Sequence, residues 1–398
     1  MASLLFSLKK HSAKAKAEPK GFPARAFPCF FALLITLALL FITLVLPHRS
    51  YSPQRDESLA PFPAFSMEAL WSGTYTQSLE EYLNDHFAMR DRASALCNRV
   101  KYTFGNNQIN DIFILSDRLI KNVGTHSLAA ADSNVNAIRE FTDAYQQTTP
   151  CYFGLIPTAS EIYKDMLPDA PKVLNQADFI SRMYSELPDA TIDISSNLTS
   201  QKSERLYYNT DSRWTSYGAY VGYTAIIKNL GGMAASLDQF SIEHASHDFY
   251  GDLYNQTLVR TNPADVIDLY HYKNGSVIER FTSTSSKDEQ PDENIFFKDY
   301  LDTSHKQDTF LGSPAAVVTL TTNVKNGAHL LLFRDSYADA LMQFLPLHYE
   351  SITLVDLSLA NAAQIEDIHP ADYSCILFLY HVDTFVSNNA IATKLPLI

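Results

Sequence analysis

The chain has 398 residues, 46% hydrophobic and 19% charged, and its 24 Phe and 22 Tyr exclude general disorder because disordered chains are poor in aromatic residues. The net charge is −13, but residues 1–25 carry six basic residues and one acidic residue (+5), which leaves −18 for the remainder. Electrostatic attraction supplies most of the affinity for polyanions, so this acidic part is a poor candidate for binding nucleic acid.

Residues 27–46 read FPCFFALLITLALLFITLVL, a run without a single charge. A helix of this length matches the hydrocarbon core of a bilayer, about 30 Å thick. The stretch is longer than the usual core of a cleavable signal, and no A-x-A-like cleavage site follows it. The sequence therefore predicts a single-pass transmembrane anchor over 27–47. By the positive-inside rule, the basic tail 1–26 is expected in the cytoplasm and the C-terminal domain outside the cell membrane.

Two segments separate this anchor from the main domain. Residues 48–70 are polar and rich in proline, which is typical of a tether. In the extension 71–133, apolar residues first recur at helical intervals up to about residue 104. The run IFILSDRLI then predicts a short β-hairpin with Ser116 and Asp117 at its turn.

From residue 134 onward, apolar strands alternate with helical patterns. The predicted strands are CYFGLIP, TIDIS, AHLLLF, SITLVDL and CILFLY, and the strongest helix, SYGAYVGYTAIIKN, ends at Gly231-Gly232. Continuous apolar strands between helices predict an α/β fold, a mostly parallel sheet with helices on both faces. Residues 240–325 are Tyr- and Thr-rich, so we expect a mixed β insertion there within the domain 134–398.

The four cysteines are Cys29, Cys97, Cys151 and Cys375. Cys29 lies in the apolar span, whereas Cys151 and Cys375 begin predicted strands. Buried thiols are the favoured interpretation, and one disulfide would be compatible with an oxidising compartment. The spacing is not that of a metal site, and no cofactor is expected.

The most informative turn is LLLFRDSYADAL, where an apolar strand runs directly into Asp335 and Ser336 and a helical pattern follows. In open parallel sheets, reactive groups collect at the carboxyl ends of the strands. A serine there can act as a nucleophile, with backbone N–H groups to hold an oxyanion. The alternative is an ordinary helix cap, because Asp and Ser are common in that role.

A second segment, YYNTDSRWTSYGAY, lies at residues 207–220. Together with RDSY at 334–337, LEEYLNDHFAMRDR, LIPTASEIYKDMLP and FYGDLYNQT, it resembles the DHHW family, which is related to the AlgX/AlgJ-type SGNH-hydrolase-like proteins of polysaccharide O-acetylation. The resemblance spans roughly residues 75–385 with the segments in order. It implies an SGNH-hydrolase-like fold and a site that acts on extracellular glycan.

Carried over by position, the resemblance implies that Ser336 is the nucleophile and Asp211 the carboxylate of a catalytic triad. The family's histidine base falls at position 213, where this chain has Arg213. A serine hydroxyl is a weak nucleophile until a base takes its proton, and a guanidinium has no acceptor for one. We therefore expect Arg213 to form an ion pair or bind an anionic group in the cleft. The cleft residues expected to bind substrate are Arg213, Trp214, Arg334, Asp335 and Tyr337.

His381 is the best candidate for a substitute base, because it follows the strand CILFLY and should emerge at the same sheet edge as Ser336. Two hypotheses result. The favoured one is a catalytically impaired relative that binds a cell-surface glycan or a membrane O-acylation partner. The alternative is an active serine O-acetyltransferase or acetylesterase that uses Ser336 with His381.

Overall fold

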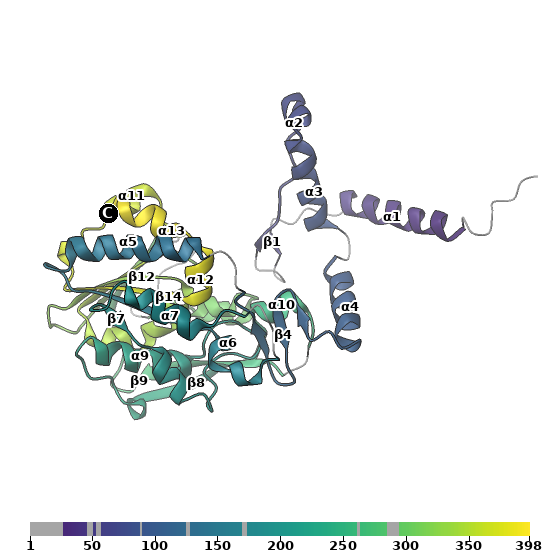
Figure 1. Ribbon diagram of the computed structural model, residues 1–398. Coiled ribbons are helices and arrows are strands. Elements are labelled where there is room, and N and C mark those ends of the chain that lie inside the picture. Colours follow the sequence, from purple (N-terminus) through teal and green to yellow (C-terminus); the bar gives the residue numbers. More distant parts are fainter. Residues whose placement is uncertain are drawn as a thin grey trace, which may run out of the picture. The chain divides into compact units, whose positions relative to one another are not determined.

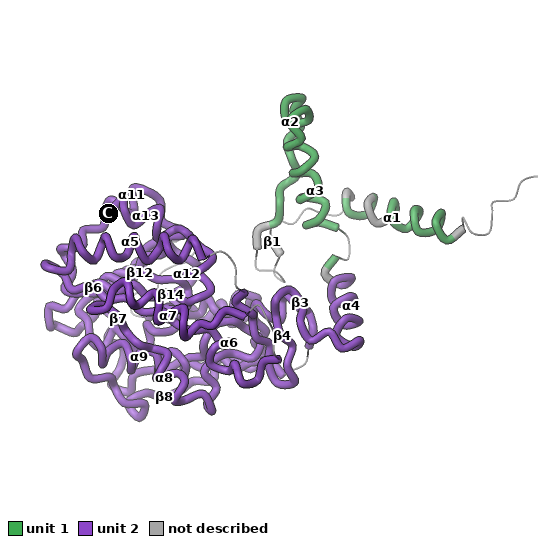
Figure 2. The backbone as a smooth tube through the Cα atoms, in the orientation of Figure 1, with its two compact units in different colours: residues 1–50, 58–90 green, residues 51–57, 91–398 purple. Residues whose placement is uncertain are grey.

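The computed structural model describes residues 27–45, 51–52, 57–87, 90–124, 128–168, 173–260, 263–284 and 294–398. The chain divides into two compact units, one of residues 1–50 and 58–90 and one of residues 51–57 and 91–398 (Figure 2). The predicted cytoplasmic tail 1–26 lies outside the described residues. Two short strands, β1 (Tyr51–Ser52) and β2 (Glu57–Ser58), lie within the predicted linker.

The first unit is helical, with α1 (Phe27–Val45), α2 (Met67–Ser72) and α3 (Thr74–His86). The Ser66 side chain caps α2 by accepting the N–H of Ala69, and Gly73, at φ 81°, ends α2 and begins α3. Among the residues that the structure describes, no helix combines the length and the apolar character needed to cross a membrane. The predicted anchor is thus unconfirmed.

In the described part of the second unit, the core element is a seven-stranded sheet in the order β10-β11-β13-β12-β14-β6-β7. Strands β13, β12, β14, β6 and β7 run parallel, and β11 runs antiparallel to both of its neighbours. This confirms the predicted mostly parallel sheet. Its strands are β6 (Cys151–Ile156), β7 (Thr191–Ile192), β10 (Ile278–Ser283), β11 (Val317–Thr322), β12 (His329–Arg334), β13 (Ser351–Val355) and β14 (Cys375–His381).

Both faces of the sheet are covered, which explains why its strands are continuously apolar. Leu331 and Phe333 of β12 pack on one face, in a cluster with residues of α5, α7 and α12. Leu330 and Leu332 pack on the other face, in a cluster with residues of α9 and η5 and of the hairpin β8–β9. Figure 1 shows α5, α12 and α13 on one side of the sheet and α9, β8 and β9 on the other.

The helices of this unit follow the predicted alternation, and α9 is capped by Thr215, whose hydroxyl accepts the N–H of Gly218. The helices are α4 (Arg90–Thr103), α5 (Ala129–Tyr145), α6 (Ala159–Ile162), α7 (Gln176–Ser185), α8 (Ser195–Ser200), α9 (Ser216–Asn229), α10 (Asp252–Thr257), α11 (Ala362–Glu366), α12 (Val382–Ser387) and α13 (Ala390–Lys394). The 3-10 helices are η1 (Lys164–Met166), η2 (Leu237–Gln239), η3 (Lys298–Asp302), η4 (Lys306–Thr309), η5 (Ser336–Gln343), η6 (Leu345–His348), η7 (Pro370–Asp372) and η8 (Leu395–Leu397).

The expected insertion 240–325 contributes to the main sheet as well as extending beyond it. Strands β8 (Phe240–Phe249) and β9 (Asp265–Tyr272) form an antiparallel ribbon of their own. Strands β10 and β11 instead extend the central sheet at the edge next to β13. The remainder, 294–316, is irregular apart from η3 and η4.

The hairpin expected in the extension is present. Strands β4 (Ile112–Ile114) and β5 (Leu119–Lys121) pair antiparallel around Ser116 and Asp117, and β3 (Gln108–Ile109) adds a third strand. All four cysteines are free thiols. Of the two in strands, Cys151 is buried, as expected, whereas Cys375 is half-buried.

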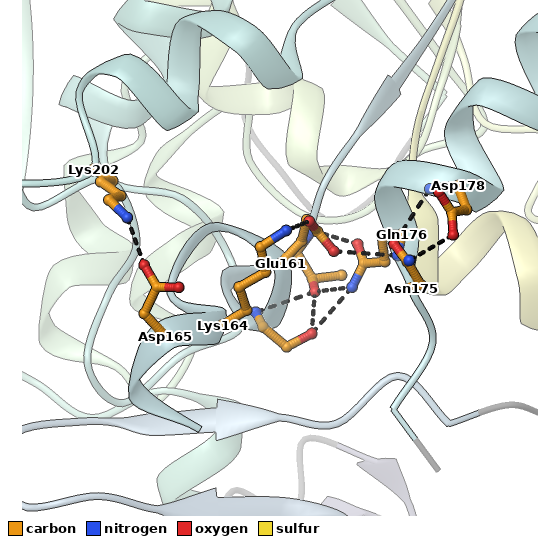
Figure 3. Close-up of polar contacts among 9 residues, drawn as sticks. Glu161, Lys164, Asp165, Asn175, Gln176, Asp178 and Lys202 are labelled. Carbon is orange, nitrogen blue, oxygen red and sulfur yellow. Dashed lines mark hydrogen bonds and ion pairs between the residues drawn. The ribbon is translucent and has the colours of Figure 1, made fainter. Parts of the chain in front are cut away.

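The turn that leaves β6 is closed by a polar network (Figure 3). The buried Gln176 side chain donates to the hydroxyls of Thr158 (2.6 Å) and Ser160 (3.0 Å) and accepts the N–H of Thr158 (2.9 Å). Glu161 accepts the N–H of Gln176 and pairs with Lys164 at 2.8 Å. This network joins the start of α6 to the start of α7, so the end of β6 is occupied by structural contacts.

Candidate functional site

A cavity of about 690 Å³ opens where β12 and β13 end. Arg334, Asp335 and Ser336 supply one part of its wall, and Asp356, which follows β13, supplies another. Residues 300–314 of the irregular segment complete the lining. The predicted site residues that line this cavity are Arg213, Trp214, Arg334, Asp335, Ser336 and Tyr337.

Ser336 is the first residue of η5 and is exposed to the cavity. Its hydroxyl makes no hydrogen bond to any residue that the structure describes, a histidine included. The buried strand β12 and the tight start of η5 fix its position, as the sequence predicts for a strand-to-helix turn. The hydroxyl is therefore accessible, and no described residue hydrogen-bonds it.

Asp335 holds the turn together. One carboxylate oxygen accepts the N–H of Tyr337 at 3.1 Å, and the other accepts the N–H of His381 at 2.9 Å. Asp335 therefore links the end of β12 to the end of β14. Burial raises its pKa to about 6, against the opposing effect of these hydrogen bonds. The carboxylate is engaged by backbone, which favours a positioning role over the substrate contact expected for it.

Asp211 is only 2% exposed and is held by a cradle of donors. Its carboxylate accepts the N–H of Arg213 at 2.9 Å and the N–H of Asp252 at 3.1 Å. A Cβ at Gly251 would lie 2.2 Å from the Asp211 carboxylate, so only glycine allows this approach. Gly251 and Asp252 lie in the segment FYGDLYNQT, and neither was among the predicted site residues. A Gly-Asp pair before a helix is the sequence signal for both.

Arg213 stands where the resemblance places the family's base. Its guanidinium lies 3.4 Å from the carboxylate of Asp211, and its side chain is 28% exposed. Burial opposes its charge, but the carboxylates of Asp211 and Asp252 raise the pKa of Arg213 overall. Burial and the charge of Asp211 also raise the pKa of Asp252. The base position therefore holds a permanent cation, as expected from the sequence.

His381 ends β14 at the same sheet edge as Ser336, as predicted, but it faces a different space. It is 2% exposed, and its ring stacks on the ring of Tyr337 with centroids 3.7 Å apart. It lines a separate cavity of about 10 Å³, together with Lys121 and Asp383. Burial lowers the pKa of His381 to about 3, and its Nε2 has no partner in the described part of the chain. The structure thus does not bring His381 into the cavity of Ser336.

Trp214 is also more enclosed than a sugar-stacking residue would be. It is 2% exposed, and its indole N–H donates to the carbonyl of Tyr337 at 2.9 Å. Its ring packs so closely on α9 that a Cβ at Gly222 would lie 2.8 Å from it. Trp214 therefore connects η5 to α9, through its hydrogen bond to Tyr337 and the packing of its ring on Gly222.

Arg334 and Asp339 form an ion pair in the cavity wall, and of the two only Arg334 was predicted as a site residue. The Arg334 Nη1 lies 2.8 Å from the Asp339 carboxylate, with Arg334 4% exposed. Burial raises the pKa of Asp339 to about 7, against the opposing charge of Arg334. Asp339 lies three residues after Ser336, and on a 3-10 helix such positions share a face. Positions three apart also share a face on an α-helix, so the helical pattern that follows Ser336 in the sequence was a sufficient signal for Asp339.

Comparison with known proteins agrees with this fold. Residues 103–355 match the family model described as DHHW protein, and the chain belongs to that family. A crystal structure of a DHHW family protein from Eubacterium siraeum is 21% identical, with a TM-score of 0.58 over 71% of this chain and 96% of the other. PatB1 of Bacillus cereus, solved with a sulfonyl adduct, is 18% identical, with a TM-score of 0.59 over 71% and 98%. These two establish the fold.

A more remote similarity is to the O-acetyltransferase domain of Pseudomonas putida AlgJ, at 12% identity over 69% of this chain and 91% of that one. Its TM-score of 0.43 is too low to carry an argument. No curated protein sequence matches the chain.

Proposed function

We propose that this DHHW-family protein is a membrane-anchored, extracytoplasmic relative of the polysaccharide-modifying SGNH proteins, and that it binds cell-surface glycan without using the serine–histidine mechanism. The observation that carries this proposal is the cation at the base position: Arg213 lies against Asp211, while the Ser336 hydroxyl in the same cavity has no partner among the described residues. Its cellular role is to hold glycan for a separate membrane O-acylation partner.

A guanidinium at the base position cannot activate Ser336. Attack by a serine requires that its proton pass to an acceptor in the same step, and a guanidinium cannot accept it. In serine hydrolases, losing the base removes several powers of ten in rate. The cradle that orients the triad carboxylate remains, but the group that it would orient is now an arginine.

The exposed Ser336 hydroxyl is the one observation that favours the alternative, a serine O-acetyltransferase or acetylesterase with a substitute base. His381 is the neutral imidazole on the same sheet edge, but Tyr337 lies against its ring and it lines another cavity. For His381 to act, the Tyr337 ring would have to move.

A covalent probe tests the two functions. A sulfonyl fluoride loses fluoride when a serine oxygen attacks its sulfur, and an adjacent base must take the serine proton. We expect Ser336 of the wild-type protein to be labelled at least about a hundredfold more slowly than Ser336 of Arg213→His, measured as adduct mass over time. Arg213→Gln is the matched control, because it removes the charge without supplying a base.

Labelling of the wild type at the rate of Arg213→His would contradict the proposal. Turnover of an acetyl ester by the wild type that disappears in Ser336→Ala would establish the alternative. Adding Ser336→Ala to Arg213→His must abolish labelling, which shows that the adduct is at Ser336.

The proposed anchor rests on the uncharged run 27–46 and the basic residues before it. Cys97 offers a test of orientation, because it is exposed and lies beyond this run. A maleimide that cannot cross membranes should label Cys97 on intact cells, and Cys97→Ser should abolish that labelling. Labelling only after the cells are broken would place the domain inside.

A further inference from the structure

Helix α4 packs on the second unit by one side only. Asn98 is 8% exposed, and its side-chain amide donates to the carbonyl of Thr257 at 2.8 Å. Tyr102 packs against the small hydrophobic cluster that residues of β4, β5 and α10 form. Residues four apart lie on the same side of a helix, so Asn98 and Tyr102 mark the inner side of α4. Figure 1 shows α4 beside β4 and α10.

The outer side of α4 carries a row of three exposed apolar side chains. Leu96 is 65% exposed, Val100 46% and Phe104 87%. Phe104 follows the last residue of α4, and its N–H donates to the carbonyl of Val100 at 3.0 Å, so Phe104 continues the helical path. The three residues are spaced by four, and Asn98 and Tyr102 lie midway between them in the chain, so this outer row lies opposite the inner side. A contiguous exposed apolar surface is typical of an interaction site.

Basic side chains flank the outer row. At about 100° of rotation per residue, Arg92 and Arg99 lie on one side of the row and Lys101 lies on the other. All three are exposed, and none forms an ion pair with a residue that the structure describes. The sequence of α4 holds four basic residues and one acidic residue (+3), whereas the chain beyond residue 25 carries −18 in all. The positive charge is therefore concentrated around the apolar row.

An apolar row between basic side chains fits an anionic bilayer surface. A helix that lies in the interface places its apolar side chains at the boundary of the acyl chains and its arginines and lysines among the lipid phosphates. A second copy of α4 would instead bring +3 against +3. The proposed span ends at residue 46 and α4 begins at residue 90, so the intervening chain keeps α4 close to a bilayer.

We propose that α4 lies on an anionic lipid surface, with Leu96, Val100 and Phe104 in the interface and the flanking basic residues on lipid phosphates. The second unit then rests on the bilayer by its α4 side. This rests on the proposed anchor and does not depend on glycan binding. Cys97 lies beside the outer row and one turn before Lys101, at the level of the headgroups, where a water-soluble maleimide still reaches it.

The test uses the full-length Cys29→Ser protein in lipid nanodiscs, with a solvent-sensitive fluorophore on Cys97. Burial raises the pKa of the other two thiols, Cys151 and Cys375, to about 12, so they react slowly with the label. The discs contain phosphatidylcholine alone or phosphatidylcholine with phosphatidylglycerol, and a lipid with a nitroxide headgroup serves as quencher. We expect the fluorophore to be quenched and its emission to shift to the blue in the anionic discs only.

Charge variants test the electrostatic part. Each basic residue near an anionic surface favours contact about fivefold, so Arg99→Gln with Lys101→Gln should lower the ratio of bound to free α4 roughly thirtyfold. The matched control is Lys228→Gln with Arg280→Gln, which removes one exposed lysine and one exposed arginine elsewhere on the second unit. The control should quench as the parent protein does.

Phe104→Gln tests the apolar part and should lower the same ratio about tenfold or more. Met233→Gln is its matched control, because Met233 is also 87% exposed, and it should have no effect.

Protein that remains in the discs with an unquenched fluorophore overturns this inference and leaves the anchor intact. Equal quenching in both kinds of disc, or quenching that survives the charge variant, also overturns it. A blue shift in lipid-free micelles that grows with protein concentration would assign the outer row to a second copy instead. Protein that elutes apart from the discs contradicts the anchor and, with it, this inference.

Discussion

Two turns leave the same edge of the sheet from adjacent parallel strands, yet they meet different surroundings. The turn after β12 places Ser336 in the large cavity, whereas the turn after β14 buries His381 beside a cavity of about 10 Å³. Asp335 hydrogen-bonds backbone in both turns, and the Tyr337 ring covers the imidazole. Two side chains at the same sheet edge are therefore not necessarily a catalytic pair. Whether they can act together depends on which residues pack over each of them.

The largest expected effect comes from removing the link between the two turns. Asp335→Ala leaves the N–H groups of Tyr337 and His381 without acceptors, so we expect the free energy of unfolding to fall by about 2–4 kcal/mol. Urea unfolding of the full-length protein measures this change. Asp356→Ala is the matched control, because among the described residues that carboxylate, at the same sheet edge, accepts only from Ser358 in its own turn. An equal loss in both variants would show that Asp335 does not couple the turns.

A second effect, of comparable size, is expected from pH in the turn of Ser336. The folded protein raises the pKa of Asp339 from 3.8 to about 7, so the folded state holds this proton more tightly than the unfolded state. The resulting stability is present below about pH 4 and is lost as pH rises to 7. Asp339→Asn stays neutral, so its stability relative to the wild type should increase from pH 4 to pH 8, measured by urea unfolding at each pH.

The opposite trend would mean that the ion pair of Asp339 with Arg334 outweighs the cost of burying the Asp339 carboxylate.

In the turn of His381, the imidazole should stay neutral above about pH 3, because burial lowers the pKa of His381 to that value. Its ring NMR signals should therefore not shift between pH 4 and pH 8.

The smallest effect is expected from His381→Phe. The substitution keeps a ring against Tyr337 and removes a nitrogen that has no partner in the described part of the chain, so the free energy of unfolding should change by less than about 1 kcal/mol. His381→Ala should cost about 3 kcal/mol, because it leaves a cavity. A large loss in the Phe variant would show that the imidazole makes hydrogen bonds, and His381 would again be a candidate base.

The sequence predicted the parallel sheet because its strands are buried on both faces and so are apolar throughout. It also placed Asp211, Arg213 and Ser336, since the first two are neighbours in the chain and Ser336 follows a recognisable strand. It could not predict what lies over each turn, because the Tyr337 ring on His381 and the wall from residues 300–314 depend on long-range packing. Segment 294–316 has no helical or strand periodicity in its sequence, so its position as a cavity wall could not be predicted.

Two further differences have local causes. The pattern YADALMQFLPLH predicted one helix, but the structure forms the 3-10 helices η5 and η6. The indole of Trp214 donates to the carbonyl of Tyr337 near the start of η5, and Gln343 at its end donates to the Ser216 hydroxyl of α9. The role of Gly251 depends on its distance from Asp211, which belongs to a separate, earlier segment of the chain. The Gly-Asp pair marks the start of a helix in the sequence, but it does not identify Asp211 as the residue that Gly251 contacts.

The place of β14 in the sheet has a consequence for synthesis. Strands β6 and β7 join the other parallel strands only through β14, which pairs with β6 on one side and β12 on the other. In the chain, β6 ends at Ile156 and β14 begins only at Cys375, so most of the domain is synthesised between them. A nascent chain must therefore keep the apolar edge of β6 protected until its last strand has emerged from the ribosome, and pauses late in translation would prolong the exposure of an aggregation-prone strand.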